Sequence, residues 1–192
     1  GILEDPWVEP PEEIYELTQS PADAPDDPTY VEIEFEAGIP VSLNGSGLGP
    51  KELISVLEAE AGRHGVGRLD MVENRLVGIK SREIYEAPAA VVLHMAHRAL
   101  EALVIPRDLD RLHRQLGCVY ADLVYNGLWF TPSREAIDAF VNNVQGRVTG
   151  RIRVKLFKGN CSVVGRQSPF ALYNQQLATY DEGDLFDHSA AE

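Results

Sequence analysis

The amino-acid sequence predicts an α+β fold in which helices pack against a mixed or antiparallel sheet. Three observations favour this class. Segments with apolar residues at every second position stand towards both ends of the chain, amphipathic helical segments lie between them, and the two types do not alternate strictly. A doubly wound parallel sheet would require that alternation. With 192 residues, of which 44% are apolar and 24% charged, the chain has the composition of a globular protein and about the size of one domain.

Two β-hairpins are expected, one in each half of the chain. In residues 29–36, apolar side chains alternate with glutamates, which is typical of a half-buried strand with its acids facing water. Residues 39–43 repeat the pattern after a glycine and should form the partner strand. In residues 151–164, apolar side chains alternate with basic ones around a Lys-Gly-Asn turn, which predicts a C-terminal β-hairpin.

Four helices are predicted between these hairpins. They should cover residues 50–61, 88–105, 109–124 and 132–144, and proline opens the first, second and fourth. Residues 62–70 read as a glycine-bearing loop and residues 71–80 as a single strand. We expect the apolar segments 128–130 and 148–157 to contribute to the core rather than to a subunit interface.

The charge is distributed unevenly along the chain. The net charge is −13, and residues 1–50 hold twelve acidic residues and no lysine or arginine. We expect residues 1–28, which are also rich in proline, to be an extended acidic leader interrupted by a short helix over residues 11–18. Acidic segments repel phosphate backbones, so the pattern argues against nucleic acid as a partner.

Other features indicate the compartment. The most helix-like apolar stretch, residues 87–105, contains four polar or charged side chains, so no membrane span is predicted. Two cysteines make no disulfide framework, and no secretory signal is recognisable. These features favour a cytoplasmic protein. A chain that opens with Gly-Ile-Leu-Glu is expected to be a segment of a longer polypeptide.

Two glycine-rich segments resemble nucleotide-binding loops without meeting their requirements. In residues 45–51, Pro50 removes an amide donor between Gly49 and Lys51, and Glu52 stands where a phosphate loop needs Ser or Thr. The glycines at 62, 65 and 67 leave a helix and enter a strand, which is the reverse of a dinucleotide fingerprint. Both segments are predicted to be turns.

Histidine and cysteine give equally weak signals. His94 and His97 lie three residues apart on a predicted helix, but no cysteine or carboxylate stands at a supporting spacing, so no metal site is predicted. Neither Cys118 nor Cys161 has a base close in sequence, and both are expected to be packed and inert.

The densest polar stretch of the body spans residues 73–88 and carries carboxylates, basic groups and a phenol around a short apolar run. Such mixed charges suit a zwitterionic ligand. A carboxylate can bind an α-ammonium group by a charge-assisted hydrogen bond, while a phenol or a guanidinium binds the α-carboxylate. The alternative is an exposed strand with surface ion pairs, each worth at most about 1 kcal/mol.

Six segments of the chain resemble the C-terminal half of the argininosuccinate synthase family. They are Gly-Ile-Leu-Glu-Asp-Pro (1–6), residues 62–75, Gly-Ile-Lys-Ser-Arg (78–82), Ile-Tyr-Glu (84–86), Leu-Val-Tyr-Asn-Gly-Leu-Trp (123–129) and Val-Lys-Leu-Phe-Lys-Gly (154–159), in the family's order. The resemblance runs from Gly1 to about Tyr180. It divides the chain into the leader, a synthetase domain over residues 29–180 that closes over citrulline, and a tail, 181–192, that would lead to a C-terminal helix beyond this sequence.

The resemblance implies an ATP-dependent ligase that joins citrulline to aspartate through a citrullyl-adenylate, on the route to arginine. It assigns two citrulline contacts to this chain, Glu73 for the α-ammonium and Tyr85 for the other end of the amino-acid head group, and no catalytic residue. ATP, with Mg²⁺, would be bound by an N-terminal domain through a Ser-Gly-Gly-x-Asp-x-Ser loop that this sequence does not contain. Aspartate, that N-terminal domain and further copies of the chain, in a homotetramer, are the other expected partners.

One residue departs from the family pattern. Glu83 stands where the family usually has glycine, and it adds a negative charge two residues from Tyr85. The sequence therefore leaves open whether the backbone at this position follows the geometry of the family. Two other functions stay open on the sequence. One is a non-catalytic amino-acid-binding or assembly module, and the other is a structural domain whose charged strand is merely solvated.

Overall fold

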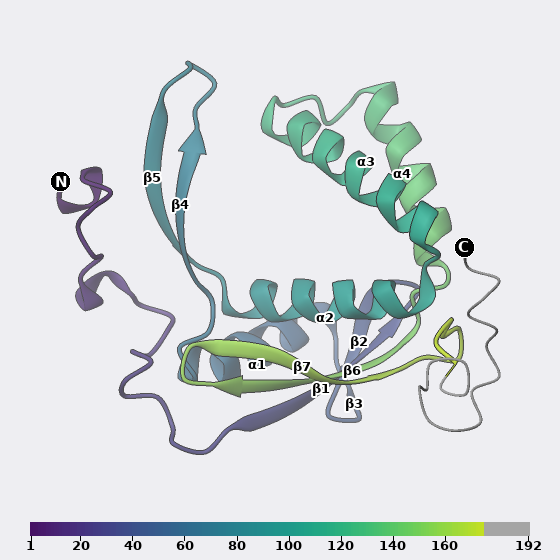
Figure 1. Cartoon of the computed structure of the whole chain (residues 1–192), viewed down its shortest axis with the longest axis horizontal. Helices are drawn as coiled ribbons and strands as arrows, with labels where there is room; N and C mark the ends of the chain where they lie inside the picture. The colour runs from purple at the N-terminus through teal and green to yellow at the C-terminus, as the bar shows by residue number, and fades with distance from the viewer. Residues whose placement is uncertain (175–192) are drawn as a thin grey trace, which may run out of the picture.

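The computed structural model describes residues 1–174, and Figure 1 shows how their elements are arranged. In chain order these are β1 (Thr29–Glu36), β2 (Ile39–Leu43), β3 (Ser46–Gly47), α1 (Pro50–Arg63), β4 (Arg68–Asn74), β5 (Lys80–Glu86), α2 (Pro88–Val104), α3 (Arg107–Tyr125), α4 (Pro132–Gln145), β6 (Gly150–Phe157) and β7 (Asn160–Gln167). The predicted α+β class is confirmed. The tail 181–192 and the last six residues of the predicted 29–180 domain lie outside the described residues.

Five strands form one antiparallel sheet in the order β3-β2-β1-β6-β7. Val31, Ile33 and Phe35 of β1 are buried and its glutamates are more exposed, as their alternation predicts. Helices α1 and α2 cover the apolar face, with α1 against β2 and α2 against β6 and β7. The sheet is therefore packed on one side and solvated on the other.

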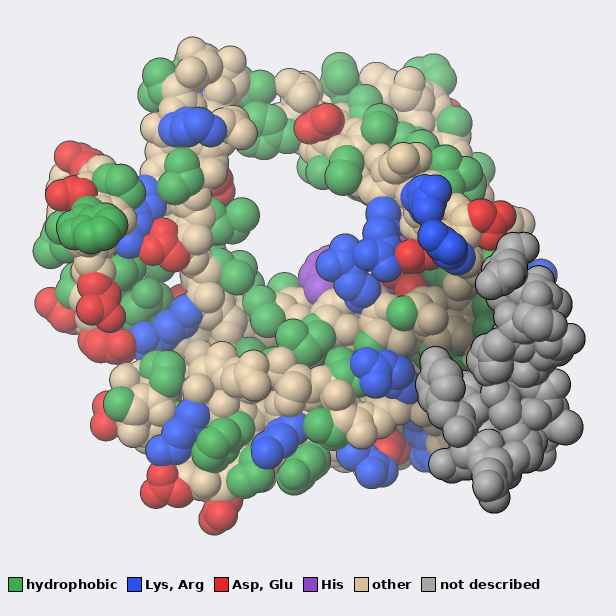
Figure 2. All heavy atoms as spheres, in the orientation of Figure 1, with side chains coloured by type: hydrophobic (Ala, Val, Ile, Leu, Met, Phe, Trp, Pro, Cys, Tyr) green, Lys and Arg blue, Asp and Glu red, His purple; other side chains and the backbone are tan. Residues whose placement is uncertain are grey.

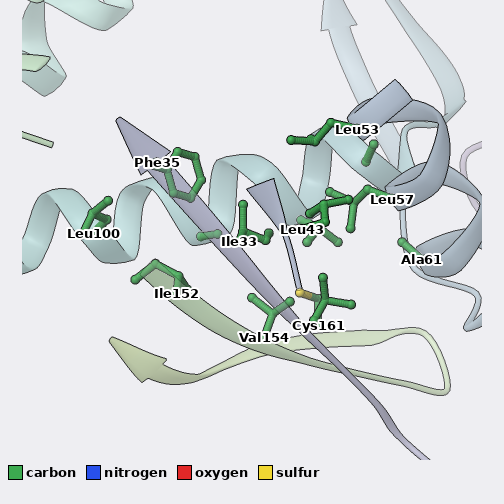
Figure 3. Close-up of a cluster of buried hydrophobic side chains, with 14 of the residues drawn as sticks. Ile33, Phe35, Leu43, Leu53, Leu57, Ala61, Leu100, Ile152, Val154 and Cys161 are labelled. Atoms are coloured by element: carbon green, nitrogen blue, oxygen red, sulfur yellow. The ribbon is translucent and has the colours of Figure 1, made fainter. Parts of the chain in front are cut away.

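The core lies between this sheet and the two helices (Figure 3). Side chains such as Ile33, Phe35, Leu57, Leu100 and Ile152 are at most 2% exposed. Helix starts at Pro50, Pro88 and Pro132 are confirmed, because proline fits the first helical turn, where no amide donor is needed. The core supplies a rigid base for the parts of the chain that project from it.

Two arms project from the same side of this body (Figure 1). One is the β4–β5 hairpin, a separate two-stranded sheet, and the other is the antiparallel pair α3 and α4. Helix α3 has no buried residue. The arms touch near their ends, where the Tyr125 hydroxyl donates to the Asn74 carbonyl over 2.9 Å.

The predicted single strand over residues 71–80 is wrong. The chain reverses at residues 75–79, where the Arg75 amide donates to the Ile79 carbonyl over 2.8 Å and Gly78 adopts a φ of +83°. Glycine permits this left-handed backbone conformation without steric cost. The apolar residues that suggested a continuous strand, Leu76, Val77 and Ile79, are exposed at this turn.

Two further expectations are corrected. Residues 11–18 do not form the predicted helix, because only Glu12–Ile14 makes a 3₁₀ turn and the chain beyond it is held by long-range hydrogen bonds. The apolar segment 128–130 is not core, since Phe130 is 91% exposed. The segment 148–157 does contribute to the core, through buried side chains at Val148, Ile152, Val154 and Leu156.

None of the helices in the described part of the chain combines the length and the apolarity needed to cross a bilayer.

Candidate functional site

The two residues singled out from the sequence meet on the β4–β5 hairpin. Glu73 lies on β4 and Tyr85 on β5, and the Tyr85 hydroxyl donates a hydrogen bond to Glu73 Oε1 over 2.7 Å. The strand register places Glu73 opposite Ser81 and Tyr85 opposite Leu69. Because side chains alternate between the faces of a strand, both residues belong to the same face of the hairpin.

This hydrogen bond and its surroundings favour the protonated phenol. The bond to Glu73, together with desolvation and the negative charges of Glu73 and Glu83, raises the pKa of Tyr85 above its ordinary value of 10.0. Tyr85 is 43% exposed and therefore accessible to a ligand. The pair thus presents a carboxylate acceptor beside a neutral hydroxyl, which suits binding and orientation of an ammonium group better than proton transfer.

Glu83, the departure from the family pattern, lies on the same face as this pair. It occupies a regular position in β5 opposite Met71, so the strand geometry accommodates a side chain there. Arg75 Nη2 forms an ion pair with Glu83, and Arg75 Nε donates to Ser81 Oγ over 2.7 Å. The added negative charge next to Tyr85 is therefore balanced by a neighbouring guanidinium.

The opposite face of the hairpin is covered by the N-terminal leader. Arg82, on that face, donates to the backbone carbonyls of Asp5 and Val8 over 3.0 and 2.8 Å. The Glu73–Tyr85 face is turned away from these contacts. In Figure 2 an open space lies between the hairpin and the α3–α4 pair, below the point where the two arms meet and on the side of the hairpin away from the leader. The candidate site is therefore accessible from the side that the leader does not cover.

Gly62 and Gly67 allow close packing of the backbone. A Cβ atom at Gly62 would lie 2.3 Å from the Leu17 carbonyl oxygen, and one at Gly67 would lie 2.4 Å from Pro88 Cα. These close approaches explain the glycines without a ligand. Residues 45–51 connect β2 to α1 as the predicted turn requires, but they include the short strand β3, which was not predicted.

The histidine and cysteine predictions have different outcomes. His97 Nε2 is hydrogen-bonded to Gln145 Oε1 over 2.8 Å, and the described residues contain no group of three or more His, Cys, Asp or Glu that could hold a metal ion. Cys161 is buried, and burial raises the pKa of its thiol to about 11, so its predicted packing is confirmed. Cys118 is exposed, and the prediction that it is packed is wrong.

Sequence reasoning missed the residues that fix the hairpin to the leader. Arg68, Arg82 and Glu86 all bond to segments within residues 5–18. The sequence shows their charges, but their partners are 50 to 77 positions away, and no local pattern could have identified them. The sequence offers one indication of this contact: the leader is acidic, whereas residues 68–86 include basic side chains that could pair with it.

Comparison with known proteins identifies the family of this chain. Residues 1–192 match the family described as "Arginosuccinate synthase C-terminal domain". Proteins named argininosuccinate synthase from Gloeobacter violaceus, Symbiobacterium thermophilum and Trichodesmium erythraeum are each 60% identical over 192 residues, which cover 100% of this chain and 48% of each relative. The chain therefore spans about half the length of the curated relatives it matches. It belongs to the argininosuccinate synthase family, in which it corresponds to the C-terminal domain.

Proposed function

We propose that this chain is the synthetase domain of an argininosuccinate synthase, the ATP-dependent ligase that condenses citrulline with aspartate in arginine biosynthesis. The observation that carries the proposal is the Tyr85–Glu73 hydrogen bond of 2.7 Å on an accessible hairpin face, in a chain of this family. Glu73 binds the α-ammonium group of citrulline, and Tyr85 contacts the other end of the amino-acid head group. The neutral ureido tail extends away from them.

The role of both residues is to position the substrate. In the first step the ureido oxygen of citrulline forms a bond to the α-phosphorus of ATP, and the bond to pyrophosphate breaks. In the second step the aspartate amine bonds to the activated carbon, AMP leaves with the former ureido oxygen, and the amine releases a proton. Fixing the head group brings the ureido oxygen into near-attack geometry, which lowers the entropic part of the barrier.

ATP and Mg²⁺ are assigned to the N-terminal domain of the complete enzyme. The described residues supply no cluster that could hold a metal, and Pro50 removes an amide donor from the glycine-rich turn before α1. We further propose that the enzyme is a homotetramer in the cytoplasm. The exposed Phe130 and the unburied surface of α3 support assembly with other chains, because apolar surface of this kind marks interaction sites.

The test is steady-state kinetics on the full-length protein. Glu73→Gln keeps the size of the side chain but removes its charge, and the loss of a charge-assisted contact should raise the citrulline KM about tenfold or more. The KM values for ATP and aspartate should stay within about twofold. Glu36→Gln, which removes the same charge from an exposed end of β1, is the matched control. An unchanged citrulline KM in Glu73→Gln would remove Glu73 from the site.

A second test separates the ligase from a non-catalytic binding module. The full-length sequence should contain a Ser-Gly-Gly-x-Asp-x-Ser loop before Gly1, and the protein should release pyrophosphate when citrulline and ATP are supplied. Citrulline binding without pyrophosphate release would favour the module.

A further inference from the structure

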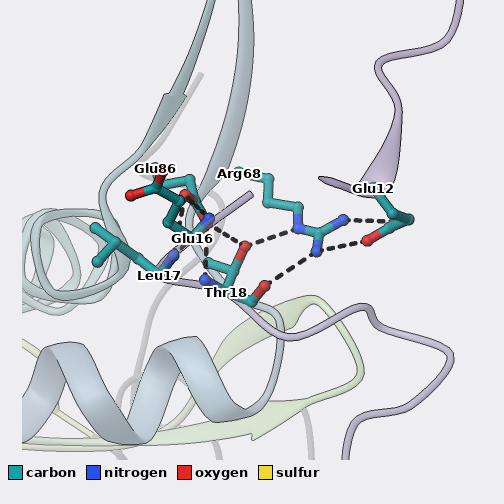
Figure 4. Close-up of polar contacts among 6 residues, drawn as sticks. All are labelled: Glu12, Glu16, Leu17, Thr18, Arg68 and Glu86. Atoms are coloured by element: carbon teal, nitrogen blue, oxygen red, sulfur yellow. Dashed lines mark hydrogen bonds and ion pairs between the residues drawn. The ribbon is translucent and has the colours of Figure 1, made fainter. Parts of the chain in front are cut away.

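The carboxylate of Glu86, the last residue of β5, accepts hydrogen bonds from three successive backbone amides of the leader (Figure 4). Oε2 accepts from Glu16 N at 2.6 Å and Leu17 N at 3.0 Å, and Oε1 accepts from Thr18 N at 2.7 Å. The Thr18 hydroxyl adds a fourth donor to Oε1 at 2.5 Å. One side chain thus satisfies the backbone donors of a segment that belongs to no helix or strand.

Arg68, the first residue of β4, holds the same segment from the other strand. It is paired with Glu86 in the strand register. Its Nε donates to Thr18 Oγ1 over 2.8 Å, and its two terminal nitrogens bind the Glu12 carboxylate over 2.8 and 2.9 Å. The guanidinium also lies 3.7 Å from the centre of the Tyr15 ring. Both residues at the base of the hairpin therefore bind the leader.

These contacts attach the base of the hairpin to the leader, in addition to the Arg82 bonds to Asp5 and Val8 and the Tyr125–Asn74 bond near the tip. β4 and β5 form their own sheet and add no strand to the five-stranded one. An isolated two-stranded hairpin is marginally stable in water, so its orientation depends on what it packs against. Glu86 and Arg68 lie on the face opposite Glu73 and Tyr85, because they share the alternate positions of each strand. The leader supports the hairpin from behind the candidate site.

The pKa of Glu86 is consistent with a carboxylate that is held by these hydrogen bonds in its charged form. Burial opposes its ionisation, but the hydrogen bonds from the Thr18 hydroxyl and from the three backbone amides outweigh this effect and hold the pKa of Glu86 below its ordinary value of 4.5. The carboxylate is therefore charged at neutral pH, when it accepts all four bonds.

We infer that Glu86 is a positioning residue for the amino-acid substrate, and that it acts through its hydrogen bonds to residues 16–18. This inference rests on the proposed function, because it assumes that the hairpin face with Glu73 and Tyr85 binds citrulline. A hairpin fixed at its base presents the two side chains in one orientation, so substrate binding orders less of the protein. Loosening the base should weaken citrulline binding more than it slows the chemical step.

The experiment compares two glutamates in the full-length protein. Glu86→Gln retains one acceptor oxygen, cannot accept all four bonds, and should raise the citrulline KM about fivefold or more, with kcat and the KM for ATP within about twofold. Glu58→Gln is the matched control, since Glu58 accepts a bond from the Ala89 amide over 2.7 Å at the start of α2 rather than from the amides of residues 16–18. Glu86→Asp, which retains the charge, should give a smaller rise.

Hydrogen exchange supplies the readout of the contact itself. The amides of residues 16–18 should exchange faster in Glu86→Gln than in the unaltered protein or in Glu58→Gln. If Glu86→Gln does not fold, Thr18→Val replaces it, because that change removes the hydroxyl that bonds to both Glu86 and Arg68.

The outcomes are distinguishable from those of the proposed function. Faster exchange at residues 16–18 with an unchanged citrulline KM would overturn the positioning role, and so would unchanged exchange. An unchanged citrulline KM in Glu73→Gln would instead overturn the substrate site, whatever Glu86→Gln does.

Discussion

The Tyr85 phenol donates to Glu73 Oε1 over 2.7 Å although the two residues are 12 positions apart in the chain. The separation is bridged by a tight reversal at residues 75–79, which brings β5 back along β4. The hydrogen bond places a carboxylate beside a neutral hydroxyl on an exposed face of the hairpin. This face and the packing around it lead to predictions about citrulline binding and about stability.

The phenol hydroxyl should contribute to citrulline binding and little to stability. Tyr85→Phe removes one hydrogen-bonding group, and because a single neutral bond is worth about 0.5–1.5 kcal/mol, the citrulline KM should rise about two- to tenfold. The melting temperature should hardly change, since the side chain is 43% exposed. Tyr30→Phe, at a 53% exposed tyrosine of β1, is the control. A citrulline KM equal in the two variants would exclude the hydroxyl from binding.

The Arg75–Glu83 pair should matter through charge balance at the site. Arg75→Gln leaves Glu83 without its ion-pair partner on the face that carries Tyr85, and we expect a higher citrulline KM because the free carboxylate repels the substrate's carboxylate. Removing both charges in Arg75→Gln/Glu83→Gln should restore the KM. A double-mutant cycle measures this coupling, and strictly additive effects would show that the pair does not act as a unit.

His64 should make stability depend on pH below its ordinary pKa of 6.5. Its side chain is 0% exposed, and burial, aided by the Arg63 charge and opposed by Glu60, lowers the pKa of His64 below its ordinary value of 6.5. The unfolded chain therefore binds a proton more readily, so stability is full above pH 6.5 and falls, by at most about 1.4 kcal/mol per pH unit, as pH drops towards the folded pKa.

Thermal melts of the full-length protein from pH 8 to pH 5 measure this effect. His64→Gln should flatten the slope in that window, whereas His94→Gln, at an exposed histidine, should not. The carboxyl groups with lowered pKa, such as Glu12, Asp70 and Glu86, titrate below this range. An unchanged slope in His64→Gln would contradict the assignment.

Two glycines should differ in their tolerance of alanine. Both adopt a positive φ, +111° at Gly67 and +83° at Gly78, which costs a side chain roughly 1–2 kcal/mol. A Cβ atom at Gly67 would in addition lie 2.4 Å from Pro88 Cα, whereas nothing lies within 4 Å at Gly78. Urea denaturation should show a clearly larger loss of stability for Gly67→Ala. Equal losses would mean that the backbone around Pro88 moves aside at little cost.

Local pattern predicted much of this fold. The alternation in residues 29–36 predicted a strand with Val31, Ile33 and Phe35 buried, and prolines at 50, 88 and 132 predicted three helix starts. These features depend on the periodicity and backbone restrictions of neighbouring residues, which the sequence displays directly. The same local reasoning misjudged residues 71–80, because the apolar side chains of an exposed turn imitate those of a strand.

The sequence by itself determined the α+β class, which depends on residue type and short-range order, and its resemblance to the argininosuccinate synthase family made Glu73 and Tyr85 the candidates. Only the tertiary structure decided that these two side chains share one face, that Arg75 balances Glu83, and that Glu86 holds the leader at residues 16–18. The physical reason is that such contacts depend on strand register and on chain segments as many as 70 positions apart, and a register shift of one residue would turn either partner to the opposite face.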